Sequence, residues 1–150
     1  MDLILWRHAE AEASLPDANR RLTSKGQKQA KRMAAWLRKR LPDGAVVLTS
    51  PARRALETAH ALRDTVETRE ELGTGGSVAA LLKAAGWPRG GGTVVVVGHQ
   101  PTLGEAAAFV LTGRKAAWGL KKGGIIWLLS SRRDGGGGAE LYAALPPSLL

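Results

Sequence analysis

The sequence contains no cysteine and only three histidines, His8, His60 and His99. The absence of cysteine excludes disulfide bonds, thiolate metal sites and cysteine nucleophiles. A metal site built from histidine side chains alone would need all three of them. We therefore expect a protein without a resident metal ion, and no sequence motif indicates another cofactor.

The sequence also lacks any apolar run long enough to cross a lipid bilayer, and its first residues lack the basic start and apolar stretch of a signal peptide. We therefore expect a soluble, cytoplasmic protein with no membrane partner. A chain of 150 residues without an internal repeat can bury one hydrophobic core, so we predict a single domain over residues 1–150.

Acidic residues are absent from residues 18–42, a segment that contains nine lysines and arginines. That segment alone matches the formal net charge of +9 of the whole chain. Such a charge can attract an acidic protein, a nucleic acid or a membrane surface, but it also covers ordinary solvated helices. We favour a solvated helix face, because surface charge serves solubility before it serves binding.

Apolar residues recur along the chain with two spacings, one typical of helices and the other of buried strands. Ser24 and Gln27 have the spacing of a capping box, and Pro51 follows Ser50 as a proline at a first helical position does. The predicted helices cover residues 24–41, 52–62, 77–85 and about 103–110. The predicted strands cover residues 3–6, 45–48, 93–97, 125–129 and 140–144, with a mobile loop at 65–76 and a glycine-rich one at 132–138.

Ionisable side chains follow three of the predicted strands. Arg7 and His8 come directly after the first strand, Arg53 and Arg54 follow the second, and His99 follows the third. Because strands joined by helical crossovers run parallel, their carboxyl ends meet at one edge of the sheet. We therefore expect these five side chains to gather there.

The composition of this cluster indicates phosphate chemistry. An imidazole can attack phosphorus and carry the phosphoryl group, while guanidinium groups neutralise the charge that spreads over its oxygens. Nearby arginines also disfavour the imidazolium, which leaves a ring nitrogen free at neutral pH. Arg53 and Arg54 lie in the first turn of a helix, where the dipole disfavours cations unless an anion binds there. The alternative is that both arginines point into water.

Four segments resemble the histidine phosphatase superfamily, whose best-known members are the phosphoglycerate mutases. Residues 5–10 are similar to its Arg-His-Gly signature, and residues 20–26 to its Arg-Pro-Leu-Thr-x-x-Gly segment. Residues 50–59 are similar to its Ser-Pro-x-x-Arg-Ala-x-Gln-Thr-Ala block, and residues 97–99 to its second histidine block. The resemblance implies an α/β three-layer sandwich, with a mostly parallel central sheet and helices on both faces.

The resemblance also implies a role for each matching residue. His8 would be the nucleophile that becomes phosphohistidine, Arg7 and Arg54 would bind the phosphoryl oxygens, and His99 would complete the pocket. Arg20, in the second segment, is a further candidate for phosphate binding. No role in this set requires a metal ion.

Two positions depart from the family's pattern. Ala9 replaces the signature glycine, which preserves the pocket unless that position needs a positive φ. Glu57 replaces the usual glutamine on a helix surface, where we expect it to be tolerated. Arg53 occupies a variable position of its block, so the resemblance favours Arg54 for phosphate binding, and His60 lies outside every segment.

The chain is too short for the insertions that cover the site in larger members of the family. Its length and layout resemble the small phosphohistidine phosphatases of the SixA type, which remove phosphate from a histidine of a signalling protein. We therefore predict a metal-independent phosphohistidine phosphatase whose partner is a phosphorylated carrier protein or histidine kinase domain. The alternatives are a phosphatase of small phosphate esters, such as sugar phosphates, and a non-catalytic module that binds phosphoproteins or nucleic acid through a basic helix over residues 25–40. We do not expect nucleic acid as the partner.

The general acid is the role that the sequence does not assign. Glu70 and Glu71 lie in the right region of the chain, but no spacing fixes either of them. An alkyl phosphate expels a strongly basic alkoxide and needs a proton donor. Phosphohistidine releases imidazole, a better leaving group, so a phosphohistidine substrate is favoured if neither glutamate serves.

Overall fold

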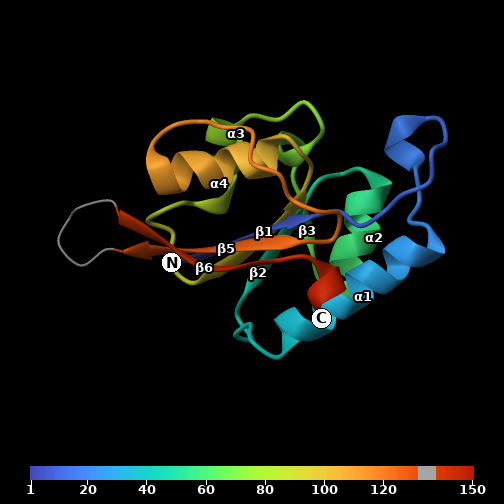
Figure 1. The fold of residues 1–150 in the computed structure, drawn as a ribbon, viewed down its shortest axis with the longest axis horizontal. Coiled ribbons are helices and arrows are strands. Elements are labelled where there is room, and N and C mark those ends of the chain that lie inside the picture. The colour runs from blue at the N-terminus through green and yellow to red at the C-terminus, as the bar shows by residue number, and fades with distance from the viewer. Residues whose placement is uncertain (132–137) are drawn as a thin grey trace.

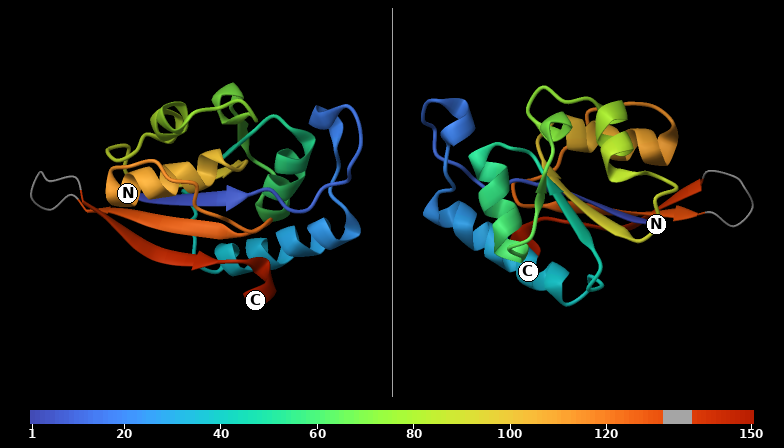
Figure 2. Two further views of the ribbon diagram at one scale, coloured as in Figure 1. Left: turned by 45° about the horizontal axis from the view of Figure 1, so that its top comes forward. Right: turned by 180° about the vertical axis from the view of Figure 1, so that it is seen from behind.

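A six-stranded sheet forms the centre of the molecule and is covered by helices on both faces (Figure 1). The computed structural model describes residues 1–131 and 138–150, so nearly all of the predicted glycine-rich loop lies outside the described residues. Helices α1 and α2 lie together on one face of the sheet, and α3 and α4 lie on the other (Figure 2). This arrangement confirms the predicted α/β three-layer sandwich.

The predicted helices and strands are all present, with ends that shift by a few residues. The strands are β1 (Asp2–Arg7), β2 (Val46–Thr49), β3 (Glu67–Thr68), β4 (Thr93–Gly98), β5 (Ile125–Ser131) and β6 (Gly138–Leu145). The α-helices of the described residues are α1 (Ser24–Arg38), α2 (Arg53–Leu62), α3 (Val78–Ala85) and α4 (Thr102–Thr112). Short 3₁₀-helices cover Asp17–Asn19, Glu70–Leu72 and Pro147–Leu149.

The sheet brings the ends of three strands to one edge. Its order is β3-β2-β4-β1-β5-β6, in which β3, β2, β4 and β1 are parallel, β5 runs antiparallel to β1, and β6 runs antiparallel to β5. Arg7 pairs with Gly98, and Thr49 pairs with Val97. Strands β1, β2 and β4 therefore end at the same level, as the sequence predicts.

Strand β1 is buried because both of its faces are covered. Leu3 and Leu5 pack against apolar residues of α3 and α4, whereas Ile4 and Trp6 pack against those of α1 and α2. All four side chains are fully buried. A strand buried on both faces has an unbroken apolar sequence, and its packing fixes the position of the residues that follow it.

The start of α1 differs from the prediction. Thr23, rather than Ser24, caps the helix, and its Oγ1 accepts a hydrogen bond from the N–H of Gly26 at 3.0 Å. The same hydroxyl donates to the carboxylate of Glu10 at 2.8 Å. A Cβ on Gly26 would lie 2.0 Å from the carbonyl oxygen of Glu10. Only glycine therefore lets α1 pack this closely against the residues that follow β1.

Two further predictions of local structure are wrong. Helix α2 begins at Arg53, because the Ser50 hydroxyl accepts a hydrogen bond from the N–H of Ala52 at 3.2 Å in a turn before the helix, so Pro51 is not a first helical residue. The segment predicted as a mobile loop, residues 65–76, contains strand β3 and the 3₁₀-helix Glu70–Leu72. Strand β3 has only two residues, both exposed, so it gives no apolar periodicity.

Candidate active site

Four of the predicted site residues meet at the edge where β1, β2 and β4 end. Arg7 is the last residue of β1 and is followed by His8, Arg54 lies in the first turn of α2, and His99 follows β4. The ring centroids of His8 and His99 are 5.2 Å apart. His8, Arg54 and His99 are only 8%, 4% and 5% exposed. Two imidazoles and two guanidinium groups thus share one small, nearly dry site.

The backbone fixes which nitrogen of the His8 ring carries the proton. Nδ1 lies 2.8 Å from the carbonyl oxygen of Ala9, which can only accept, so Nδ1 donates. In the neutral ring, Nε2 therefore carries the lone pair. The N–H of Ala9 in turn donates to Oγ1 of Thr58 at 3.0 Å, which ties this loop to α2. Ala9 has a negative φ, so the alanine that replaces the signature glycine fits without strain.

His99 is held by Ser50, which the sequence analysis placed at the start of a helix and of the Ser-Pro block without a role in the site. Its Nε2 lies 2.8 Å from Oγ of Ser50, and the Ser50 side chain is completely buried. This contact fixes the plane of the ring and leaves Nδ1 for a ligand. The two residues are 49 positions apart, and the predicted helix start already accounts for a serine at position 50, so no local pattern indicates the contact.

Both imidazoles are held in the neutral form. Burial is the main cause that lowers the pKa of His8 to about 4, and the nearby His99, Arg54 and Arg7 lower it further. Burial likewise lowers the pKa of His99 to about 4, with Arg54 as the next cause. The sequence analysis predicted the direction from the arginines, but loss of hydration is the larger effect. At neutral pH the His8 lone pair is therefore available.

We expect the two histidines to remain uncharged well below the pH at which a free histidine is protonated. In an NMR titration, the ring resonances of His8 and His99 should move near pH 4 rather than near 6.5. Between these pH values the unfolded chain binds more protons than the folded chain, so the free energy of unfolding should decrease as the pH falls through this window. Denaturant titrations at both ends of the window measure this decrease. Ring titration near 6.5 would contradict the burial argument.

Within the described residues, Arg7 and Arg54 each keep a buried Nε donor without a partner. Nη1 of Arg7 donates to the carbonyl oxygen of Leu120 at 2.7 Å, and Nη1 of Arg54 donates to the carbonyl oxygen of Asp17 at 2.9 Å. The Nε atoms of Arg7 and Arg54 are the buried side-chain polar atoms in the described part of the chain that lack a hydrogen-bond partner. Leaving a buried cationic donor unpaired is costly, so this arrangement suits a bound anion.

Asp17 connects Arg54 with Arg20, the third predicted phosphate-binding arginine. Its carboxylate lies 3.2 Å from Nη2 of Arg54 and 3.3 Å from Nη1 of Arg20. Nε of Arg20 donates to the carbonyl oxygen of Glu12. These arginines lower the pKa of Asp17, chiefly through the hydrogen bond from Arg20. Arg20 thus reaches the cluster through Asp17. The sequence analysis missed Asp17 because its neighbours Pro16 and Asn19 suggest only a turn.

Other candidate residues lie outside this cluster. Glu71 forms an ion pair with Arg69 at 2.7 Å, and its pKa is lowered, so its carboxyl group is ionised. Glu70 is exposed on the same 3₁₀-helix. Arg53 is exposed and pairs with Glu57, whose other carboxylate oxygen accepts from the N–H of Leu22 at 2.8 Å. His60 is also exposed. Among the described residues, neither Glu70 nor Glu71 forms a hydrogen bond or ion pair with the cluster, so a general-acid role for either one stays a prediction.

The described residues contain no group of three or more histidine, aspartate and glutamate side chains arranged to hold a metal ion. Among the helices described, none is both long and apolar enough to cross a membrane.

Comparison with known proteins gives a consistent family relationship. Residues 3–73 match the model of the histidine phosphatase superfamily (branch 1). An uncharacterized protein of Picosynechococcus sp. is 36% identical over 143 residues, which cover 87% of this chain and 86% of that protein.

Solved structures share the fold over nearly the whole chain. A candidate phosphohistidine phosphatase, SixA, from Nakamurella multipartitia is 30% identical and superimposes with a TM-score of 0.79 over 97% of this chain and 95% of that one. A protein histidine phosphatase SixA in complex with tungstate is 24% identical, with a TM-score of 0.80 and 99% coverage of both chains. At that identity, the second comparison shows the fold alone.

Proposed function

Because the chain belongs to the histidine phosphatase superfamily, and is a phosphatase of that family, we propose that it hydrolyses protein phosphohistidine through a covalent intermediate on His8. The observation that carries this proposal is the hydrogen bond from Nδ1 of His8 to the carbonyl oxygen of Ala9. It leaves the lone pair on Nε2 of a neutral ring that is surrounded by arginines. Such a nitrogen can attack phosphorus without prior loss of a proton.

The reaction then has two steps. The Nε2 lone pair attacks phosphorus, the bond from phosphorus to the substrate imidazole breaks, and the departing ring nitrogen takes the electron pair and a proton from solvent. Water attacks the phosphorus of phosphorylated His8, gives up a proton, and releases inorganic phosphate while the electron pair returns to Nε2. In both steps Arg7 and Arg54 would neutralise the phosphoryl oxygens, and His99 would donate a hydrogen bond from Nδ1.

The ionised carboxyl group of Glu71 supports a substrate with a good leaving group. A hydrogen bond from its own backbone, followed by the ion pair with Arg69, lowers the pKa of Glu71, so this carboxylate lacks the proton that a general acid would need. An alkoxide leaving group requires such a proton, whereas an imidazole requires it much less. The similarity to the SixA from Nakamurella multipartitia, a candidate phosphohistidine phosphatase, also supports a phosphohistidine substrate.

We expect turnover to depend steeply on the leaving group. The value of kcat/KM should be highest for a phosphohistidine carrier protein and lower for p-nitrophenyl phosphate. For phosphoserine it should be lower than for p-nitrophenyl phosphate by roughly 100-fold or more, because a general acid contributes about that factor. Release of inorganic phosphate measures all three reactions in one assay. The p-nitrophenyl ester is the internal control, since it has a weakly basic leaving group and no protein surface. Phosphoserine turnover as fast as that of phosphohistidine would instead indicate a phosphatase of small esters with a working general acid.

A further inference from the structure

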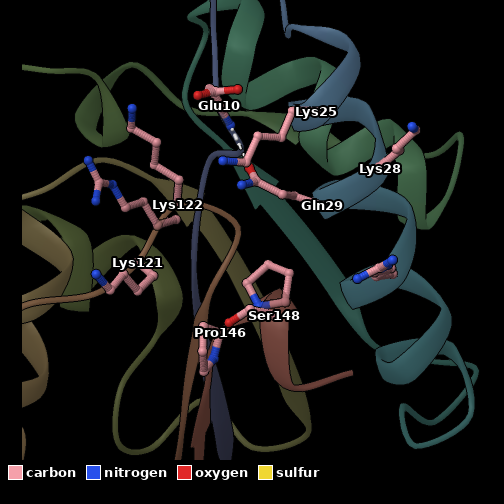
Figure 3. Close-up of a pocket in the computed structure, with 11 residues that line it drawn as sticks. Glu10, Lys25, Lys28, Gln29, Lys121, Lys122, Pro146 and Ser148 are labelled. Atoms are coloured by element: carbon pink, nitrogen blue, oxygen red, sulfur yellow. Dashed lines mark hydrogen bonds between the residues drawn. The ribbon is translucent and has the colours of Figure 1, made fainter.

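A basic cleft of about 690 Å³ lies beside the proposed catalytic cluster, which consists of Arg7, His8, Arg54 and His99. Figure 3 shows Lys25 and Lys28 of α1 along one side and Lys121 and Lys122 along the other. The residues after β6 form its base, where Pro146 and Ser148 are seen. With Arg7 and Glu10 at and after the end of β1, the cleft is thus formed by four separate segments of the sequence.

The charge in this cleft has almost one sign. Its lining contains one carboxylate, that of Glu10, and six cationic side chains: Arg7, Lys25, Lys28, Arg32, Lys121 and Lys122. Within residues 1–131 and 138–150, none of the six forms an ion pair. A concave surface with several unneutralised cations concentrates the positive potential and attracts an anionic partner.

The cleft and the catalytic cluster share Arg7. Its Nη1 donates to the carbonyl oxygen of Leu120, directly before Lys121, and the N–H of Gly123 approaches the carbonyl oxygens of Arg7 and His8 at 3.1 and 3.2 Å. The lysines of this segment are therefore held against the residues that would carry the phosphoryl group. A ligand in the cleft would lie next to a phosphate on His8.

We propose that this basic cleft docks an acidic segment of the phosphorylated protein, next to its phosphorylated histidine. The assignment rests on the proposed function, because it supplies the protein part of the same substrate. Lys25, Lys28 and Arg32 follow one another at helical spacing on α1 and all line the cleft. The basic segment that the sequence analysis assigned to solubility therefore has a second use on one face of the helix.

The lining of the cleft favours a protein over a nucleic acid. Single-stranded nucleic acids are held by cations together with aromatic side chains on which the bases stack. The cleft has no aromatic side chain, and the carboxylate of Glu10 lies among its cations. The volume also exceeds what a lone phosphate would fill, whereas carboxylates on successive turns of a helix could each meet a different lysine or arginine.

The test is a charge-reversal variant, Lys25→Glu/Lys28→Glu/Arg32→Glu. The control, Lys31→Glu/Lys39→Glu/Arg89→Glu, also replaces two lysines and one arginine, at exposed positions outside the cleft. With a phosphohistidine carrier protein that has an acidic surface, kcat/KM of the cleft variant should fall about tenfold or more through KM, while the control stays within about twofold. With p-nitrophenyl phosphate, both variants should match the wild type. Thermal unfolding checks that both variants are folded.

Three results would overturn the docking proposal. They are carrier turnover by the cleft variant that equals wild type, an equal loss with p-nitrophenyl phosphate, and cleft-dependent binding of a single-stranded oligonucleotide that is tighter than binding of a fluorescein-labelled glutamate-rich peptide. Fluorescence anisotropy of the labelled peptide measures binding in the cleft without turnover, so it tests the docking proposal separately from the proposed phosphatase function. If the wild type does not turn over the carrier, the proposed function fails, but peptide binding that only the cleft variant loses still supports the acidic-ligand site.

Discussion

Replacing His8 with alanine is expected to lower phosphatase turnover at least about 1000-fold, since loss of a covalent nucleophile removes the reaction path and not only a contact. The ring is the group whose Nε2 lone pair faces a site with two arginines, and Ala9 fixes its tautomer. Alanine retains the backbone but supplies no nitrogen. The measurement is kcat/KM for the phosphohistidine carrier protein and for p-nitrophenyl phosphate.

The matched control for this variant is His60→Ala. His60 is exposed on α2 and does not touch the catalytic cluster, so its removal should leave turnover unchanged within about twofold. Rapid acid or base quench adds a direct readout: the wild type should carry phosphate that is stable to base and labile to acid, and the His8→Ala variant should carry none. Full turnover by His8→Ala would show that another group attacks phosphorus, and the mechanism proposed above would be wrong.

The meeting of Arg7, His8, Arg54 and His99 was predictable from the sequence because it follows from the order and direction of three strands. Buried apolar runs identify β1, β2 and β4, and parallel connections place their carboxyl ends together. Charged or imidazole side chains that follow such runs are therefore candidates for the site. Arg7, His8 and His99 follow this rule, and the first turn of α2 adds Arg54.

The supporting residues were not predictable, because their partners are far away in the chain. Ser50 reaches His99 across 49 positions, and Asp17 reaches Arg54 across 37. Nothing in the local sequence separates a serine or aspartate that closes a turn from one that also orients a catalytic group. The cap of α1 is a different case: Ser24 and Thr23 are both good caps, and the packing of Gly26 on Glu10 decides between them.

The basic cleft shows a limit of charge counting. Residues 18–42 contain nine cations, but only Lys25, Lys28 and Arg32 line the cleft, together with Lys121 and Lys122 from a distant segment. A count along the sequence detects the excess of positive charge. It does not show that some of these cations line a concave surface. Concavity depends on the position of the loop after Leu120 relative to α1, which tertiary structure alone provides.

Replacing Arg54 with glutamine is expected to lower kcat/KM by about 100- to 1000-fold, the range typical of removing one preorganised donor from a developing anion. Arg54 is 4% exposed, its Nε has no partner, and its charge acts on both histidines. Glutamine keeps hydrogen-bonding capacity but not the charge. Arg54→Lys should recover only part of the loss, because a single ammonium group cannot reproduce the planar fork that binds phosphate oxygens.

Arg53 provides the matched control at the neighbouring position. It lies on the same first turn of α2, but it is exposed and pairs with Glu57, so Arg53→Gln should change kcat/KM by less than about twofold. The Arg54 variants should also show a higher KM for p-nitrophenyl phosphate and weaker inhibition by inorganic phosphate, which report on anion binding. Because Asp17 is largely solvent-exposed, it can be rehydrated when Arg54 is replaced, and the fold should survive. Equal effects at the two positions would mean that helix charge in general, rather than the buried guanidinium, governs catalysis.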